Sequence, residues 1–228
     1  KVASDPAAIR RMFDRIAPRY DLVNSLLSLG QHRRWKARAA RLCQVPPGGR
    51  ALDVCAGTGD IALALSRLGA EVVALDFAPH MLARAQERRG RQRLALVQGD
   101  ALALPFRDAS FEAAAVGFSL RNVFSLPGLL AEMRRVVRPG GWVVSLETSQ
   151  PSSRLVQRIY HQYLRLAVSF APLLSVGSAS RSLAQTIFAF PPADEVAGLF
   201  RAAGLEEVSH QALLLGVVAI HRGRVPRS

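Results

Sequence analysis

Between an apolar run and a helical pattern, the chain reads Leu52-Asp53-Val54-Cys55-Ala56-Gly57-Thr58-Gly59-Asp60. The apolar run over residues 51–55 has the length of a buried strand, and apolar side chains recur at helical spacing over residues 61–68. A strand, a tight glycine turn and a helix in this order are typical of a parallel α/β sheet. Because glycine has no side chain, the turn lets a small ligand lie against bare backbone.

The spacing of these glycines disfavours two common phosphate-binding loops. No third glycine stands at the dinucleotide spacing, and no Lys-Ser or Lys-Thr pair follows as in nucleoside triphosphate loops. The pattern Asp-x-x-x-Gly-x-Gly instead resembles the first motif of the S-adenosylmethionine-dependent methyltransferases. That resemblance implies a cofactor site containing Asp53, Gly57, Thr58 and Gly59.

Two more acidic residues follow apolar runs downstream. Residues 72–75 lead into Asp76, and residues 94–98 are followed by Gly99 and Asp100. The carboxyl ends of parallel strands border the ligand crevice, so we expect Asp76 to accept hydrogen bonds from the ribose hydroxyls and Asp100 to meet the adenine amino group. The alternative for Asp76 is capping of a helix over residues 79–89. Capping does not explain why three acids stand at three strand ends.

Length and composition bound the class of protein. The chain has 228 residues, half of them hydrophobic, which suffices for one core and is most simply a single domain. No apolar run reaches the roughly 18 residues of a membrane span, and no signal peptide is visible. Cys43 and Cys55 lack metal-ligand spacing, so we expect no metal site, and Cys55 is expected in the core of the first strand. These features favour a reducing, cytoplasmic location.

The charge balance is strongly basic. The formal net charge is +13, and 28 of the 30 basic residues are arginine, which is more typical of genome composition than of function. Such a charge still favours polyanions such as nucleic acid or an anionic membrane surface. Basic residues gather over 10–41 and 84–93, but no aromatic residues interleave with the second cluster as a platform for single strands requires.

Periodicity and breakers predict a Rossmann-like α/β fold. We expect strands over residues 50–55, 71–76, 94–98, 111–117 and 141–147, and helices over 60–68, 79–89 and 126–137. The sheet should have seven strands, mostly parallel with an antiparallel last strand, and helices on both faces. Within a single domain over 1–228, we distinguish a helical cap (1–45), a cofactor-binding core (50–147), a substrate-side insertion (152–190) and closing elements (193–221).

The N-terminal cap, the insertion and the C-terminal elements are also predicted in detail. The cap should contain helices over 6–17, 21–29 and 32–43, and residues 152–176 should be mostly helical. A helix over 193–203 should precede a hairpin of strands over 206–211 and 213–221, and the breaker at 138–141 should turn sharply into the fifth strand.

Longer segments resemble one methyltransferase family. Residues 20–35, the segment Gly117-Phe118-Ser119-Leu120-Arg121-Asn122-Val123, residues 135–149 and the tail 216–223 are similar to the ubiquinone/menaquinone biosynthesis C-methyltransferases. The resemblance covers nearly the whole chain. It implies a class I enzyme that uses S-adenosylmethionine to methylate a ring carbon of a prenylated quinol, with demethylmenaquinol favoured and a benzoquinol as the alternative. Phe77, Ala101 and Gly117 join the expected cofactor site.

One segment departs from the family pattern. Between Ser178 and Pro191 the family usually has a tyrosine-rich stretch that runs into Glu-Ser-Ile-Arg. Here Gln185 replaces the acid and Phe188 the arginine. We therefore expect altered polar contacts to the acceptor ring, which bears on the identity of the quinone head group.

The chemistry requires a base or water relay and a cation, because a ring carbon becomes nucleophilic when an adjacent hydroxyl loses its proton. Arg121 follows the fourth strand, and we assign it the catalytic role of stabilising the quinolate and orienting a water; the alternative is a salt bridge to Glu147. Tyr20 is expected to orient the substrate or to anchor the cap. His32 and His221 are expected to be structural. We expect three aromatic residues either to line an isoprenoid channel or to belong to the core: Phe170, Phe188 and Phe190.

Two rival functions are disfavoured. Methyltransferases of exocyclic amines in nucleic acid carry Asp/Asn-Pro-Pro-aromatic where this chain has residues 117–120. A non-catalytic RNA-binding protein would not need the glycine loop and the strand-end acids. We therefore expect a prenylated quinol as the substrate and no nucleic acid as a partner. We also expect peripheral contact with the inner face of an anionic membrane, and we leave open whether the protein forms a homodimer.

Overall fold

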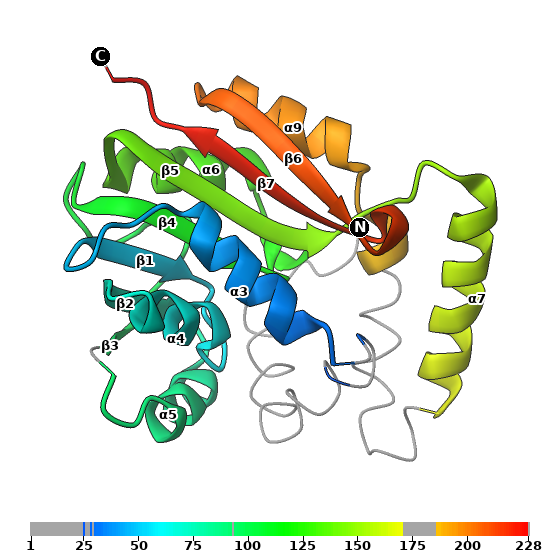
Figure 1. Ribbon diagram of the computed structural model, residues 1–228, viewed down its shortest axis with the longest axis horizontal. Coiled ribbons are helices and arrows are strands. Elements are labelled where there is room, and N and C mark those ends of the chain that lie inside the picture. Colours follow the sequence, from blue (N-terminus) through cyan, green and yellow to red (C-terminus); the bar gives the residue numbers. More distant parts are fainter. Residues whose placement is uncertain (1–24, 26–27, 29, 93, 171–185, 228) are drawn as a thin grey trace.

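The structure is a computed structural model that describes Ser25, Ser28 and residues 30–92, 94–170 and 186–227. Its central element is a seven-stranded sheet. The strand order is β3-β2-β1-β4-β5-β7-β6 (Figure 1). The strands are β1 (Arg50–Val54), β2 (Glu71–Asp76), β3 (Leu94–Gln98), β4 (Phe111–Gly117), β5 (Val137–Thr148), β6 (Glu206–Leu213) and β7 (Val218–Arg224). β7 pairs antiparallel with both neighbours, and the other pairs are parallel. The predicted fold class is confirmed.

Helices cover both faces of this sheet. They are α3 (His32–Leu42), α4 (Asp60–Arg67), α5 (Pro79–Arg88), α6 (Leu126–Val136), α7 (Arg154–Phe170) and α9 (Ala193–Ala202), with 3-10 turns η2 (Leu120–Asn122) and η4 (Leu214–Gly216). In Figure 1, α3 and α4 lie on the near face while α6 and α9 lie behind the sheet. The predicted helices over 32–43, 60–68, 79–89, 126–137 and 193–203 are confirmed to within a residue at each end.

Alternate side chains of the central strand, β4, belong to two separate hydrophobic cores. Ala113 and Ala115 of β4 pack in one hydrophobic cluster with residues of α3 and α4. Ala114 and Val116 pack in the other cluster with residues of α6 and α9. Successive strand residues point to opposite faces, so a central parallel strand must be apolar throughout. The apolar run at 113–116 therefore reflects burial on both sides.

Several predicted boundaries differ from the structure. β5 begins at Val137, not at residue 141, because Val137 pairs with Phe111 across a bulge and the expected turn lies inside the strand. The closing strands pair as predicted, but β6 continues to Leu213 and η4 separates it from β7. Cys55 is not in the first strand: it follows β1 with a φ of 54°.

Other predictions fall outside the described residues. These are the helices over 6–17 and 21–29, Tyr20, and positions 171–176 of the insertion. The helix predicted in that insertion is confirmed as α7.

Candidate active site

The glycine loop turns sharply between β1 and α4. Cys55, Gly57 and Gly59 all have positive φ, of 54°, 55° and 82°. Gly59 is the residue before α4, and a Cβ placed on it would lie 3.2 Å from the Cβ of Ala85. Side chains are disfavoured at such φ values, so glycine suits these turns. The loop therefore keeps its backbone bare at the carboxyl edge of the sheet.

Asp76 holds this loop to the end of β2. One carboxylate oxygen accepts a 2.8 Å hydrogen bond from Gly57 N–H, and the other accepts a 2.9 Å bond from Ala78 N–H. Ala78 immediately precedes α5, so the carboxylate does not bind the helix's first turn as a capping residue would. These two bonds fix the carboxylate at the carboxyl end of β2, beside the glycine loop.

Asp53 is buried beneath the loop. Its Oδ2 accepts a 2.8 Å hydrogen bond from the N–H of Ala62, the third residue of α4, where helical N–H groups lack partners within the helix. Burial raises the pKa of Asp53 to about 7. Asp53 therefore joins β1 to α4 in addition to bordering the cavity described next.

A cavity of about 520 Å³ opens over the carboxyl ends of β1, β2, β3 and β4. Seven of the nine predicted cofactor residues line it: Asp53, Gly57, Asp76, Phe77, Asp100, Ala101 and Gly117. Thr58 and Gly59 are not in its wall. The Thr58 carbonyl and hydroxyl oxygens each accept a 2.8 Å hydrogen bond from Arg88 Nη1, so Thr58 connects the loop to α5.

Sequence reasoning missed other residues of this cavity. Its wall also contains Lys36, Cys55, Gln98, Ser119, Asn122 and Phe124. Residues 119–124 follow the fourth strand, and position alone could have indicated them. Lys36 gives no comparable signal, because it lies 24 residues before Asp60 and reaches the cavity only through helix packing.

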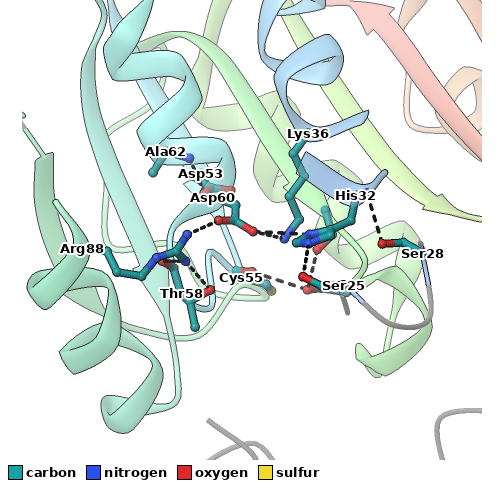
Figure 2. A network of polar contacts seen from close by, with 12 residues as sticks. Ser25, Ser28, His32, Lys36, Asp53, Cys55, Thr58, Asp60, Ala62 and Arg88 are labelled. Carbon is teal, nitrogen blue, oxygen red and sulfur yellow. Dashed lines mark hydrogen bonds and ion pairs between the residues drawn. The ribbon is translucent and has the colours of Figure 1, made fainter. Parts of the chain in front are cut away.

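A network of charges joins α3, α4 and α5 beside the loop (Figure 2). The carboxylate of Asp60 accepts from Lys36 Nζ at 2.7 Å and from Arg88 Nη2 at 2.5 Å, while His32 Nδ1 lies 3.7 Å from it. Although burial opposes ionisation, the charges of Lys36 and Arg88 hold the pKa of Asp60 well below its usual range. One carboxylate therefore faces two buried or half-buried cations.

His32 and His221 have structural partners, as predicted. The Nε2 atom of His32 is 3.0 Å from the Ser25 hydroxyl, and its backbone N–H donates to Ser28 Oγ at 3.2 Å. Nε2 of His221 lies 2.9 Å from the Ala193 carbonyl, and burial lowers the pKa of this imidazole to about 4. His221 is therefore a neutral core histidine that joins β7 to α9.

Arg121 lies in η2 and forms a short ion pair with Glu147 of β5. Glu147 is fully buried, and its Oε1 also accepts from the backbone N–H of Thr148 at 2.7 Å. Within the described part of the chain, Arg121 Nε and Glu147 Oε2 are buried without a hydrogen-bond partner. The predicted alternative of a salt bridge is thus present, yet it leaves a donor and an acceptor unused.

A second cavity of about 510 Å³ adjoins the first. Val123 and Phe124 line both cavities. Among the described residues that line the second cavity, Arg121 is the charged one, and most of the others are apolar, including Leu120, Leu126, Ala189, Phe190 and Leu199. A cation in an apolar wall suits an aromatic molecule that carries an anionic oxygen.

Two phenylalanines of the segment that differs from the family pattern, residues 178–191, are described by the structure. Phe190 is buried, packs with the core of α6 and α9, and lines the second cavity. Phe188 contacts the His161 ring of α7 at a centroid distance of 4.6 Å. Gln185 and the side chain of Phe170 lie outside the described residues.

Comparisons with known proteins agree with the sequence motifs. Residues 1–225 match the model of the ubiE/COQ5 methyltransferase family. The chain is 37% identical to a demethylmenaquinone methyltransferase of Staphylococcus carnosus, over 98% of this chain and 95% of the relative. It is 38% identical to the demethylmenaquinone methyltransferase of Bacillus subtilis, over 94% of this chain and 96% of the relative. The family resemblance is thereby confirmed.

Solved structures share the fold at low identity. A chain from the complex between the Haloferax volcanii Trm112 methyltransferase activator and a methyltransferase has a TM-score of 0.69 at 17% identity, covering 94% of this chain and 97% of that one. Haemonchus contortus phosphoethanolamine N-methyltransferase 2, solved with S-adenosyl-L-methionine, has a TM-score of 0.63 at 15% identity and covers 86% of this chain and 53% of that one. At such identities the likeness concerns the fold alone.

Proposed function

The chain belongs to the ubiE/COQ5 methyltransferase family, and from this membership we propose that it converts demethylmenaquinol to menaquinol by methylating a ring carbon. It is an S-adenosylmethionine-dependent methyltransferase. The observation that carries the substrate proposal is the pair of adjoining cavities. One has strand-end acids and bare glycine backbone, and the other is apolar with Arg121 in its wall.

The first cavity fits the chemical groups of S-adenosylmethionine. Asp76 lines it at the end of β2, where we place the ribose hydroxyls, and Asp100 lines it after β3, where we place the adenine amino group. A Cβ on Gly117 would lie 2.5 Å from Ile61 Cδ1, so a side chain there would displace the end of Ile61. Lys36 offers a cation for the methionine carboxylate. When bound, S-adenosylmethionine supplies an activated methyl group, and the protein aligns the acceptor with it.

Arg121 carries the acceptor chemistry in this proposal. Its guanidinium stabilises the negative charge that forms on the ring oxygen when the quinol loses its proton, and it orients the water that takes that proton. An arginine does not itself act as the base, because its pKa exceeds about 12. Arg121 lines the second cavity, which places its side chain beside the proposed position of the ring. Tyr20, proposed to orient the substrate, lies outside the described residues.

The ion pair with Glu147 fits this role. Glu147, which is fully buried, fixes the guanidinium from one side, while Arg121 itself lines the second cavity. A preorganised cation needs no reorganisation when charge develops, which is the main source of transition-state stabilisation in such sites.

We extend the proposal to peripheral contact with an anionic membrane surface, because a prenylated quinol is carried in a bilayer. Among the described residues, no helix is long and apolar enough to cross a membrane. The arginines over 10–24 of the predicted basic cap lie outside the described residues, while Arg33, Arg34, Arg38 and Arg41 lie on α3. A homodimer stays a prediction.

The test is methylation of short-chain substrates by the purified protein. The enzyme is supplied with labelled S-adenosylmethionine and either reduced short-chain demethylmenaquinone, its benzoquinol counterpart or RNA, and products are identified by mass spectrometry. We expect a ring-methylated naphthoquinol. Preferential methylation of the benzoquinol would mean that the substrate is a benzoquinol and not the proposed naphthoquinol. Methylation of RNA alone, or no transfer to any acceptor, would contradict it.

A further inference from the structure

Exposed apolar side chains concentrate on two elements of the structure, α7 and η4. Seven large hydrophobic residues in the described part of the chain are exposed, and five of them lie on α7 and η4. We call these five the α7–η4 surface: Leu155, Ile159, Leu166, Leu214 and Leu215. The other two, Leu68 and Phe124, lie elsewhere, and Phe124 borders the cavities. Contiguous exposed apolar patches mark interaction sites more often than single residues do.

Helix α7 is apolar on two opposite faces. Leu155, Ile159 and Leu166 are 64%, 62% and 58% exposed, and their spacing of four and seven residues places them on one stripe. The opposite face contains Leu164, which is 3% exposed, and Tyr160, which packs on the core. The inward face therefore accounts for the packing of α7, and the outward stripe has no role in that packing.

Arginines accompany the outward stripe at the same spacing. Arg154, Arg158 and Arg165 each precede one of the three aliphatic residues, so they form a second stripe about 100° around the helix. All three are exposed, and α7 contains no acidic residue. Long arginine side chains can keep their charge at a polar surface while the neighbouring aliphatic groups enter an apolar one.

The turn η4 adds two leucines in a strained conformation. Leu214 and Leu215 have φ values of 46° and 56°, and they are 54% and 78% exposed. A Cβ on Gly216, the last residue of η4, would lie 3.3 Å from Pro151 Cα, so η4 sits against the segment that leads from β5 into α7 (Figure 1). Positive φ is unfavourable for leucine, and here it displays side chains to solvent where burial cannot compensate.

The same helix connects this surface to the acceptor side of the site. Tyr160 lies on the inward face of α7, and burial raises its pKa to about 12 while the charges of Arg121 and Glu147 also act on it. The outward stripe and the catalytic arginine thus lie on opposite sides of one helix. A lipid-borne acceptor bound near Arg121 would have the α7–η4 surface close to its prenyl chain.

We propose that the α7–η4 surface is the part of the protein that docks on an anionic phospholipid bilayer. The five aliphatic side chains enter the interface, and the three arginines of α7 bind lipid phosphate groups. The inference rests on the proposed function in that a lipid-borne quinol brings the enzyme to a membrane. A second copy of this chain is a poor occupant, because it would bring two arginine stripes together on a protein of net charge +13.

The test is flotation with vesicles of phosphatidylcholine, with and without phosphatidylglycerol, at low and high salt. We expect the wild-type protein to bind only the anionic vesicles and to dissociate in salt. The double variants Leu155→Ser/Ile159→Ser and Leu214→Ser/Leu215→Ser should each lose most binding. Removing Arg154 and Arg158 together should lower binding roughly 25-fold, at about fivefold for each cation near the surface.

Leu68→Ser is the matched control, since Leu68 is an exposed leucine (43%) outside the α7–η4 surface. It should float with anionic vesicles as the wild type does. Circular dichroism and methylation of a short-chain, water-soluble quinol establish that each variant is folded and active. Failure of every protein to methylate that quinol would contradict the proposed function without affecting the flotation result.

Three outcomes would overturn the docking proposal. The first is unchanged flotation of both leucine double variants. The second is equal binding of the wild type to neutral and anionic vesicles. The third is a stable wild-type dimer in sedimentation equilibrium that the leucine variants convert to monomer, without vesicle binding by either form.

Discussion

Lys36 of α3 donates a 2.7 Å hydrogen bond to the carboxylate of Asp60, the first residue of α4, and both side chains are buried. Arg88 of α5 binds the other oxygen of that carboxylate. Three helices therefore meet on one acid directly behind the glycine loop. Because Lys36 also lines the first cavity, α3 supplies a charged group to a wall that is otherwise formed mainly at the strand ends.

Replacement of Lys36 by methionine should weaken cofactor binding. Methionine retains much of the side-chain volume but removes the cation proposed to bind the methionine carboxylate. Loss of a charged hydrogen bond costs about 1.5–3 kcal/mol, so the dissociation constant should rise roughly 10- to 100-fold. Calorimetric titration with S-adenosylmethionine measures this change. Arg33→Met, at an exposed position of the same helix, is the control, and equal affinities of the two variants would limit Lys36 to a structural role.

Asp76→Ala should also weaken cofactor binding by about 1.5–3 kcal/mol, because a charged acceptor for the ribose is lost. It should lower the melting temperature too, since Gly57 and Ala78 lose their hydrogen-bond acceptor. Asp76→Asn keeps one acceptor oxygen and should retain more stability while still binding cofactor weakly. Titrations and thermal melts on both variants test this. Unchanged cofactor affinity would reduce Asp76 to a tether of the loop.

Arg121→Ala should lower single-turnover methylation by a factor on the order of 10²–10³ while leaving cofactor affinity near normal. Arg121→Lys should restore only part of the rate, because lysine lacks the planar fork that binds Glu147 and substrate together. Both variants disturb the buried pair, so thermal melts must accompany the kinetics. Normal turnover by the folded fraction of Arg121→Ala, with stability lost, would assign Arg121 to structure alone.

Asp53 should make stability fall as pH rises from about 4 to 7. Burial raises its folded-state pKa from 3.8 to about 7, so in this range the folded protein holds a proton that the unfolded chain has released. The stabilisation is complete below pH 4 and lost above pH 7. His221 acts in the opposite direction, because its lowered pKa destabilises the folded protein as pH falls from 6.5 toward 4.

Asp53→Asn isolates the first effect, because asparagine can still accept from Ala62 N–H and does not titrate. Urea denaturation at pH 5 and pH 8 gives the free energy of unfolding for both proteins. We expect the wild type to lose more stability than Asp53→Asn between these values. Identical pH dependence in the two proteins would show that Asp53 ionises in the folded state as it does in water.

Local patterns determined most of the sheet and its ligand edge. The strand bounds at 71–76, 94–98 and 111–117 agree with the structure, because the central residues of buried parallel strands are apolar on both faces. Asp53, Asp76 and Asp100 could be assigned to one cavity because parallel strands end at one edge. The family motifs then identified the cofactor. Failures occurred at 137–141 and 212–217, where a bulge and a 3-10 turn depend on pairing with distant strands.

Tertiary structure decided the roles of residues that periodicity cannot assign. Lys36 lines the cavity, and Thr58 accepts a hydrogen bond from Arg88, only because α3 and α5 pack beside the loop. The contact of Arg121 with Glu147 and the exposure of Leu155, Ile159 and Leu166 on α7 likewise became known only once the helices and strands were placed in space. The physical reason is that chain periodicity specifies which residues are buried, whereas the partners of charged side chains depend on long-range packing.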